Sequence, residues 1–202
     1  MRSVVNDIQN KIGTSIKLPE GYHIEYGGQF ESEQAASRTL LLTSLMSLLV
    51  IFLLLYNEFK NAKESGVILL NLPLALIGGV FILWLTSGEI SIPAIIGFIS
   101  LFGIATRNGM LLISHYTHLR TVENVPLKQA VLQGSMDRLN PILMTALSSA
   151  LALIPLALNG DLPGNEIQSP MATVILGGLL TSTFLNGFII PIVYLIMNKN
   201  KE

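Results

Sequence analysis

The chain lacks cysteine altogether and carries little charge. Its 202 residues include no Cys, and charged residues make up 12% of them. The missing thiols exclude disulfides, thiolate metal sites and iron–sulfur clusters, and a net charge of −1 gives no reason to expect a nucleic-acid partner. The sequence has no GxxxxGK[ST] phosphate-binding loop, and its apolar runs contain no Asp or Glu. We therefore expect neither an enzyme nor a bound cofactor.

What remains is strongly apolar, since hydrophobic residues make up 50% of the chain. A membrane-spanning helix needs roughly 20 consecutive apolar residues. The sequence predicts an all-α membrane protein with five transmembrane helices. The predicted spans are 39–56, 66–86, 92–115, 141–158 and 171–197.

Basic residues are confined to alternate connections between these spans. Lys and Arg resist translocation, whereas acidic residues have little influence on orientation. Connections 86–91 and 159–170 contain neither Lys nor Arg, so we expect them and the N-terminal segment on the outer, periplasmic side and the C-terminus in the cytoplasm. The cytoplasmic connections would carry Lys60, Lys63, Arg120, Lys128, Arg138, Lys199 and Lys201.

The first 35 residues differ in kind from the rest. Residues 1–13 have the pattern of a short amphipathic helix, and residues 22–28 that of a strand ending at glycines. One helix and one strand bury too little surface to form a core. We expect 1–35 to be the tail of a larger outside domain and 36–202 to be the transmembrane domain, so that the chain is the C-terminal part of a longer protein.

A second amphipathic segment precedes the fourth span. Leu127, Ala130, Val131 and Gly134 recur at helical spacing. The pattern predicts a helix over about 126–137 that lies on the inner membrane surface.

Arg107 stands near the middle of the apolar run 92–114. An arginine near a bilayer centre costs roughly 2.5–3.5 kcal/mol on insertion scales and is normally kept for a partner inside the protein. A guanidinium does not titrate in proteins, so we expect Arg107 to serve as a fixed counter-charge to a carboxylate from outside these residues. Asn108 can hydrogen-bond the pair in either protonation state. The alternative is a cation that snorkels or only holds helices together.

Further polar and small residues accompany Arg107. The Thr145 hydroxyl is a candidate relay in the same network, although membrane hydroxyls often bond to their own helix instead. Arg138 is best interpreted as an anchor at the inner interface, with a role in ion entry as the alternative. His115 and His118 are three residues apart but have no third ligand, so we expect no metal site there.

Two features concern the mechanics of the helices. Pro73 interrupts backbone hydrogen bonding in the second span, as a hinge or, more simply, as a static kink. Gly177 and Gly178 give the fifth span a small-residue face suited to close helix packing, with sliding against a moving neighbour as the alternative.

Three segments together resemble one family. LFGIATRNGMLLISHY (101–116), DRLNPILMTALSSALALIPLAL (137–158) and GNEIQSPMATVILGGLLTSTFLNGFIIPIVY (164–194) resemble the C-terminal end of a resistance-nodulation-division (RND) efflux pump. The resemblance implies that the five spans are the last five of twelve. It also implies that LPEGYHIEYGGQFESEQ (18–34) is the end of the periplasmic porter domain, so that the N-terminal segment is an α/β remnant of that domain.

The resemblance also implies a role for each polar residue. In relatives, the position of Arg107 is commonly a lysine, and an asparagine follows it. This lysine faces two aspartates on the fourth span, and a hydroxyl that matches Thr145 belongs to the same network. Arg138 matches a basic residue that flanks this network. The arginine keeps the charge but lacks a titratable amine, so a relay that deprotonates lysine is in doubt here, whereas a fixed cation is not.

The loop GNEIQSP before the last span resembles the heavy-metal branch of the family. That branch implies a cation/proton antiporter of the bacterial inner membrane, driven by the proton gradient. It also implies a homotrimer with a periplasmic adaptor and an outer-membrane channel, completed by the upstream half of the pump. The alternatives are a multidrug pump of the same fold and a truncated membrane fragment without transport activity.

Overall fold

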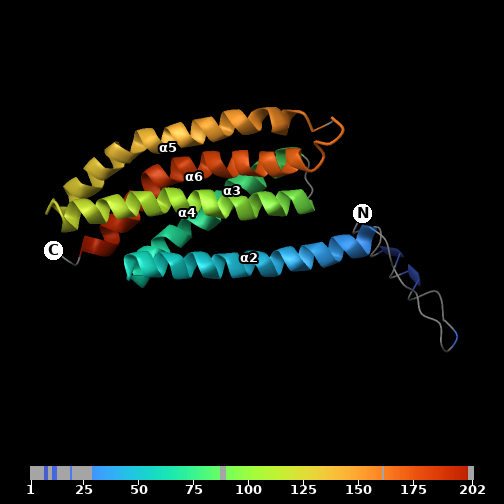
Figure 1. Ribbon diagram of the computed structural model, residues 1–202, viewed down its shortest axis with the longest axis horizontal. Coiled ribbons are helices and arrows are strands. Elements are labelled where there is room, and N and C mark those ends of the chain that lie inside the picture. Colours follow the sequence, from blue (N-terminus) through green and yellow to red (C-terminus); the bar gives the residue numbers. More distant parts are fainter. Residues whose placement is uncertain are drawn as a thin grey trace. The chain divides into compact units, whose positions relative to one another are not determined.

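Helices make up almost all of the part of the chain that the structure describes. The computed structural model describes residues 7–8, 11–12, 19, 29–86, 90–160 and 162–199. Five long helices follow one another in it (Figure 1), and all five are long and apolar enough to cross a membrane. They are α2 (Gln29–Phe59), α3 (Ala62–Thr86), α4 (Ile92–Thr121), α5 (Leu127–Leu158) and α6 (Gln168–Asn198). The prediction of five apolar membrane helices is confirmed.

The chain divides into two compact units, Met1–Thr43 and Ser44–Glu202. In the first unit, residues 7–8 and 11–12 are helical, and Lys11 pairs with Asp7 at 3.6 Å. The described residues contain no strand, and the predicted strand at 22–28 lies outside them. The α/β remnant therefore stays a prediction.

Local sequence signals set the start of α4. The backbone N–H of Ala94 donates a long bond of 3.4 Å to the Ser91 Oγ, and a proline occupies the first turn. A serine cap satisfies one of the otherwise unpaired N–H groups of a helix start, and proline is tolerated there because its missing N–H has no partner in the helix. The helix thus begins at Ile92, as predicted from the apolar run.

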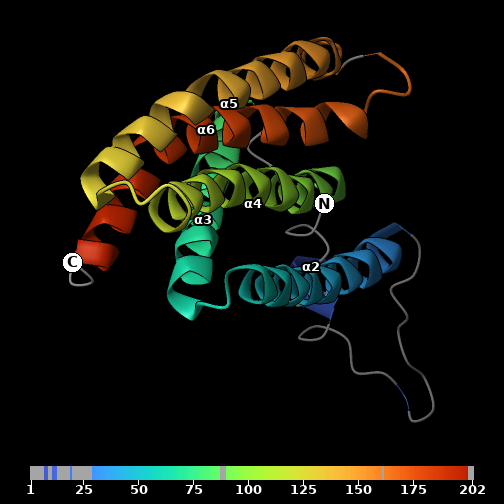
Figure 2. The same cartoon turned by 60° about the vertical axis from the view of Figure 1, so that its left-hand side comes forward.

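Within the second unit, α6 packs against α3, α4 and α5, and Figure 2 shows α3 crossing α4 and α6. The contact with α3 depends on glycine. A Cβ built on Gly177 would lie 2.6 Å from the Gly78 carbonyl oxygen, and one built on Gly178 would lie 3.0 Å from the Ala75 carbonyl oxygen. The backbones of α3 and α6 are therefore too close together for larger side chains at these positions.

Prolines do not interrupt these helices. Pro73 lies inside α3, which is assigned as one helix from Ala62 to Thr86. Neighbouring groups and local adjustment re-satisfy the carbonyls that proline frees in membrane helices. A hinge at Pro73 remains a prediction.

The region before the fourth span differs from the prediction. In place of a separate interfacial helix over 126–137, one helix runs from Leu127 to Leu158 through Pro141. It bends near its N-terminal end (Figure 1), which is consistent with an internal proline. The predicted apolar face, Leu127, Ala130, Val131 and Gly134, is buried against protein, and a Cβ on Gly134 would meet the Tyr116 ring at 2.7 Å.

Gly177→Ala tests the contact between α3 and α6. We expect a loss of stability of about 1–3 kcal/mol, because the added methyl meets a backbone carbonyl that no side-chain rotation can move away. Thermal unfolding of the detergent-solubilised protein, monitored by size-exclusion chromatography, measures this loss of stability. Gly187→Ala in the same helix is the matched control, since a Cβ there has no neighbour within 4 Å. Equal melting temperatures for the two variants would contradict the close contact.

Candidate functional site

Arg107 lies midway along α4, on a face that the described helices leave uncovered. Exposed residues recur at intervals of three or four along α4, which places them on one side of the helix. We call this side the Arg107 face. It consists of Ile96, Ser100, Gly103, Arg107, Leu111, Ser114 and His118. The opposite side of α4 is buried against the neighbouring helices.

Arg107 has no counter-charge within the described part of the chain. The ion pairs found there join Lys11 to Asp7, His115 to Asp137 and His118 to Glu123. An arginine at this depth is costly unless a partner or water meets it. That the partner of Arg107 comes from another segment stays a prediction.

Asn108 points away from the Arg107 face. Its side chain is only 3% exposed, and it precedes Gly109, at which a built Cβ would lie 3.3 Å from both Ile68 of α3 and Ile190 of α6. Successive residues of a helix with 3.6 residues per turn are about 100° apart. The structure thus separates the two residues that the sequence analysis joined.

The Thr145 hydroxyl bonds within its own helix. Thr145 is exposed on α5, and its Oγ1 donates to the Ile142 carbonyl at 2.9 Å. This bond is the alternative considered from the sequence. Arg138 is half-buried near the bend of α5. No hydrogen bond or ion pair in the described residues connects either side chain to Arg107.

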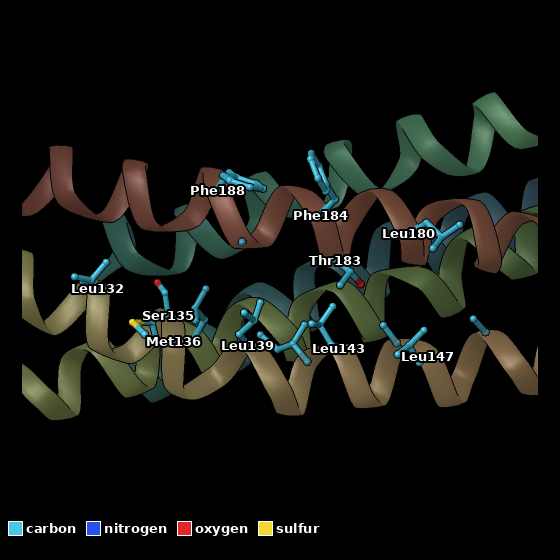
Figure 3. A pocket seen from close by; sticks show the side chains of 15 residues that line it. Leu132, Ser135, Met136, Leu139, Leu143, Leu147, Leu180, Thr183, Phe184 and Phe188 are labelled. Atoms are coloured by element: carbon cyan, nitrogen blue, oxygen red, sulfur yellow. The ribbon is translucent and has the colours of Figure 1, made fainter.

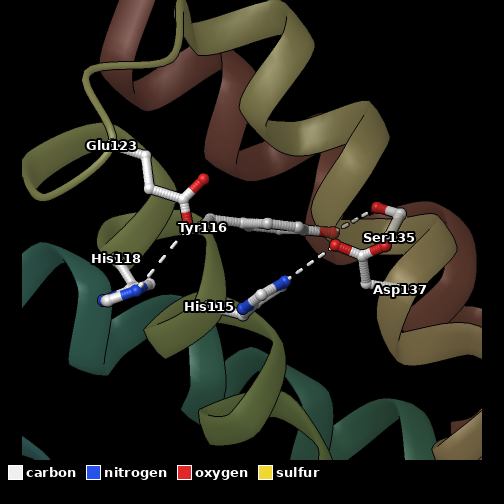
Figure 4. A network of polar contacts seen from close by, with 6 residues as sticks. All are labelled: His115, Tyr116, His118, Glu123, Ser135 and Asp137. Atoms are coloured by element: carbon white, nitrogen blue, oxygen red, sulfur yellow. Dashed lines mark hydrogen bonds and ion pairs between the residues drawn. The ribbon is translucent and has the colours of Figure 1, made fainter.

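A polar network joins the C-terminal end of α4 to the start of α5 (Figure 4). His115 Nε2 lies 3.1 Å from Asp137 Oδ2, and the Tyr116 hydroxyl bonds to the Ser135 hydroxyl. The Tyr116 ring is fully buried and lies 5.2 Å from the ring of Tyr194. The sequence analysis missed this network, because its members on α5 follow about twenty residues later and only the fold brings them near.

The His, Asp and Glu side chains of this network lie in separate pairs. The described residues contain no group of three or more His, Asp or Glu side chains that could hold a metal ion. The two histidines have different partners, since His118 lies 3.7 Å from Glu123. The arrangement is one of pairwise contacts.

A groove of about 500 Å³ runs between α5 and α6 (Figure 3). Leu139, Leu143 and Phe184 are among the residues that line it, and the polar side chains in its lining are Ser135 and Thr183. A cation leaving water needs several oxygen, nitrogen or sulfur ligands, so this groove suits an apolar occupant.

The comparisons with known proteins agree with this membrane architecture. The AcrB/AcrD/AcrF family model matches residues 1–198. The protein HelA of Legionella pneumophila is 43% identical over all of this chain, and the cobalt-zinc-cadmium resistance protein CzcA of Cupriavidus metallidurans is 38% identical over 99% of it. An X-ray crystal structure of a heavy metal efflux pump matches 98% of the chain and 20% of its own, with a TM-score of 0.84 and 36% identity.

These matches define the class of protein and then the family. The described helices are long and apolar enough to cross a membrane, and the described structure resembles that of a heavy metal efflux pump. The chain belongs to the AcrB/AcrD/AcrF family. This is the family of RND permeases that the sequence motifs resemble. It spans about a fifth of the length of the curated relatives it matches.

Two substitutions separate packing from polar contact at the end of α4. Tyr116→Ala removes a fully buried ring and should cost about 3–5 kcal/mol of stability. Asp137→Asn removes the carboxylate charge from a partly exposed contact with His115 and should cost only about 0.2–1 kcal/mol. Melting temperatures of the purified variants measure both, and Tyr116→Phe is the control that keeps the ring. A larger loss for Asp137→Asn than for Tyr116→Ala would show that the ion pair dominates.

Proposed function

We propose that this chain is the C-terminal membrane portion of a proton-driven exporter of metal cations. In this proposal Arg107 is the fixed counter-charge to a carboxylate that the rest of the pump supplies. The observation that carries it is the position of Arg107, exposed at the middle of α4 and without a counter-charge in the described part of the chain. A membrane protein retains such a cation where another buried group needs it.

The proposed coupling uses the carboxylate as the group that titrates. While ionised, it pairs with the Arg107 guanidinium, and the attraction favours the charged form of both. When a proton reaches the carboxylate, the acid becomes neutral and the ion pair is lost, while Arg107 remains charged. Loss of the ion pair then favours a movement of the Arg107 face, because an unpaired cation is costly there until it meets new partners.

The substrate is proposed from the relatives. CzcA of Cupriavidus metallidurans is named for cobalt, zinc and cadmium resistance, and CusA of Escherichia coli, 34% identical over 98% of this chain, is named as a cation efflux protein. These names support a metal cation over a multidrug substrate. Because the chain spans about a fifth of the relatives, the residues that would select the ion are expected elsewhere in the pump.

Supporting roles are proposed for the remaining polar residues. Thr145 would join the network by turning its hydroxyl from the Ile142 carbonyl toward the proton-binding group. Asn108 would act from the buried side of α4, and Arg138 would flank the entry. We also propose an inner-membrane location with connections 86–91 and 159–170 in the periplasm, and a homotrimer with an adaptor and an outer-membrane channel.

Arg107→Ala in the full-length protein should abolish metal efflux while leaving membrane insertion intact. The counter-charge is lost, and the proton-binding carboxylate is then harder to ionise in a low-dielectric site. Metal-ion export from loaded proteoliposomes measures the effect. Gly187→Ala on α6, outside the Arg107 face, is the control, since open space surrounds its Cβ.

Arg107→Lys tests what kind of cation the site requires. Near-normal transport supports a fixed positive charge, whereas loss indicates that the planar guanidinium geometry matters. Retained efflux in Arg107→Ala would refute the counter-charge role altogether.

Expression of residues 1–202 alone should confer no metal resistance on a host without its own pump. No span predicted from this sequence contains an Asp or Glu to bind the coupling proton. Growth on graded metal salts measures resistance, with the full-length protein as positive control. Resistance from the short chain would disprove the need for an outside carboxylate, and resistance of the full-length protein to dyes and detergents only would favour a multidrug pump.

A further inference from the structure

Several buried polar atoms lie without hydrogen-bond partners among the described residues. Both the Nδ2 and the Oδ1 of Asn186 on α6 are unpaired, as are the Asn71 Oδ1 on α3 and the Thr106 Oγ1 on α4. All three side chains are at least nine-tenths buried. A buried polar group without a partner costs about 1–3 kcal/mol, so four such atoms in one interface require an explanation.

Two contacts fix the register of the three helices. A Cβ built on Gly178 of α6 would lie 3.0 Å from the Ala75 carbonyl oxygen of α3. At a second level, a Cβ on Gly109 of α4 would lie 3.3 Å from both Ile68 of α3 and Ile190 of α6. The polar residues fall between these two levels.

Asn71 lies between Ile68 and Ala75 along α3, and Asn186 lies between Gly178 and Ile190 along α6. The Asn71 Nδ2 donates to the Ala105 carbonyl of α4 at 3.0 Å, and this carbonyl immediately precedes Thr106. The unpaired atoms of the three helices therefore belong to one layer near the middle of α3, α4 and α6.

Another protein segment cannot easily reach these atoms. Arg107 is exposed and can meet a partner from the rest of the pump, whereas Asn186 is 1% exposed and Asn71 is 2% exposed within this chain alone. Their helices already enclose them. The missing partner must be small enough to lie inside the interface.

We propose that Asn71, Thr106 and Asn186 form an internal hydration site that holds ordered water between α3, α4 and α6. Two amides and a hydroxyl supply both donors and acceptors, and a buried water typically makes two to four hydrogen bonds to such groups. On α4, the Ala105 carbonyl accepts from the Asn71 Nδ2, and a Cβ built on Gly109 would lie 3.6 Å from the same nitrogen. The site lies across α4 from Arg107, and its existence does not depend on the proposed transport function.

X-ray radiolytic labelling tests the site directly. Irradiated bound water produces hydroxyl radicals that oxidise adjacent side chains, which mass spectrometry locates. In the natural protein purified in lipid nanodiscs, Ile68 and Ile190 should be labelled although both are buried. Asn186→Leu should reduce that labelling several-fold, because the replacement has a similar size and no polar atoms.

Ser182→Ala is the matched control. Ser182 is fully buried one turn away on α6, but its hydroxyl already donates to the Leu179 carbonyl at 3.2 Å. Labelling should therefore stay at the wild-type level. If Asn186→Leu does not yield folded protein by size-exclusion chromatography, Asn71→Leu carries the same expectation from the other helix.

Two results would overturn the proposal. Wild-type protein without labelling at Ile68 and Ile190 would exclude bound water. If a double-mutant cycle then showed that Asn71 and Asn186 are energetically coupled, the two amides would form a direct pair. Labelling that persists unchanged in both leucine variants would show that the water does not depend on these amides.

Discussion

A positive charge at the middle of a membrane helix needs a partner, and the rest of this domain is consistent with that requirement. Arg107 is fixed in place by α4, whose other side is buried against neighbouring helices. Because the guanidinium stays charged, the proposed function assigns its neutralisation to a carboxylate that faces it. The described helices leave that face open, which is what a site shared with another part of a larger transporter requires.

On the other side of α4, the helices pack closely around α6. Glycines let α3 and α6 approach to backbone contact, and α4 lies against both helices. The same interface encloses the amides of Asn71 and Asn186. The two sides of α4 thus differ in kind, with an open cationic face and an enclosed polar layer that has no charged side chain.

The spans could be predicted from the sequence because a helix is the simplest way to satisfy the backbone in lipid. The predicted ends at Thr86, Ile92 and Leu158 coincide with the observed ends. Other features depend on tertiary contacts. The sequence predicted a separate helix over about 126–137 before the span that starts at 141, yet α5 runs without a break from Leu127 to Leu158. The exposure of Arg107, the burial of Asn108 and the His115–Asp137 contact follow from how the helices face one another, which helical periodicity in one segment does not determine.

The most direct test is a cryo-EM structure of the full-length protein in lipid nanodiscs that shows which groups surround the Arg107 guanidinium. The counter-charge hypothesis requires a carboxylate oxygen from another segment within about 4 Å of the guanidinium, the usual distance of an ion pair. A guanidinium that extends to the lipid headgroups, or that meets only hydroxyls and carbonyls, would contradict it. In that case Arg107 would be an anchor, and proton coupling would have to be sought elsewhere in the protein.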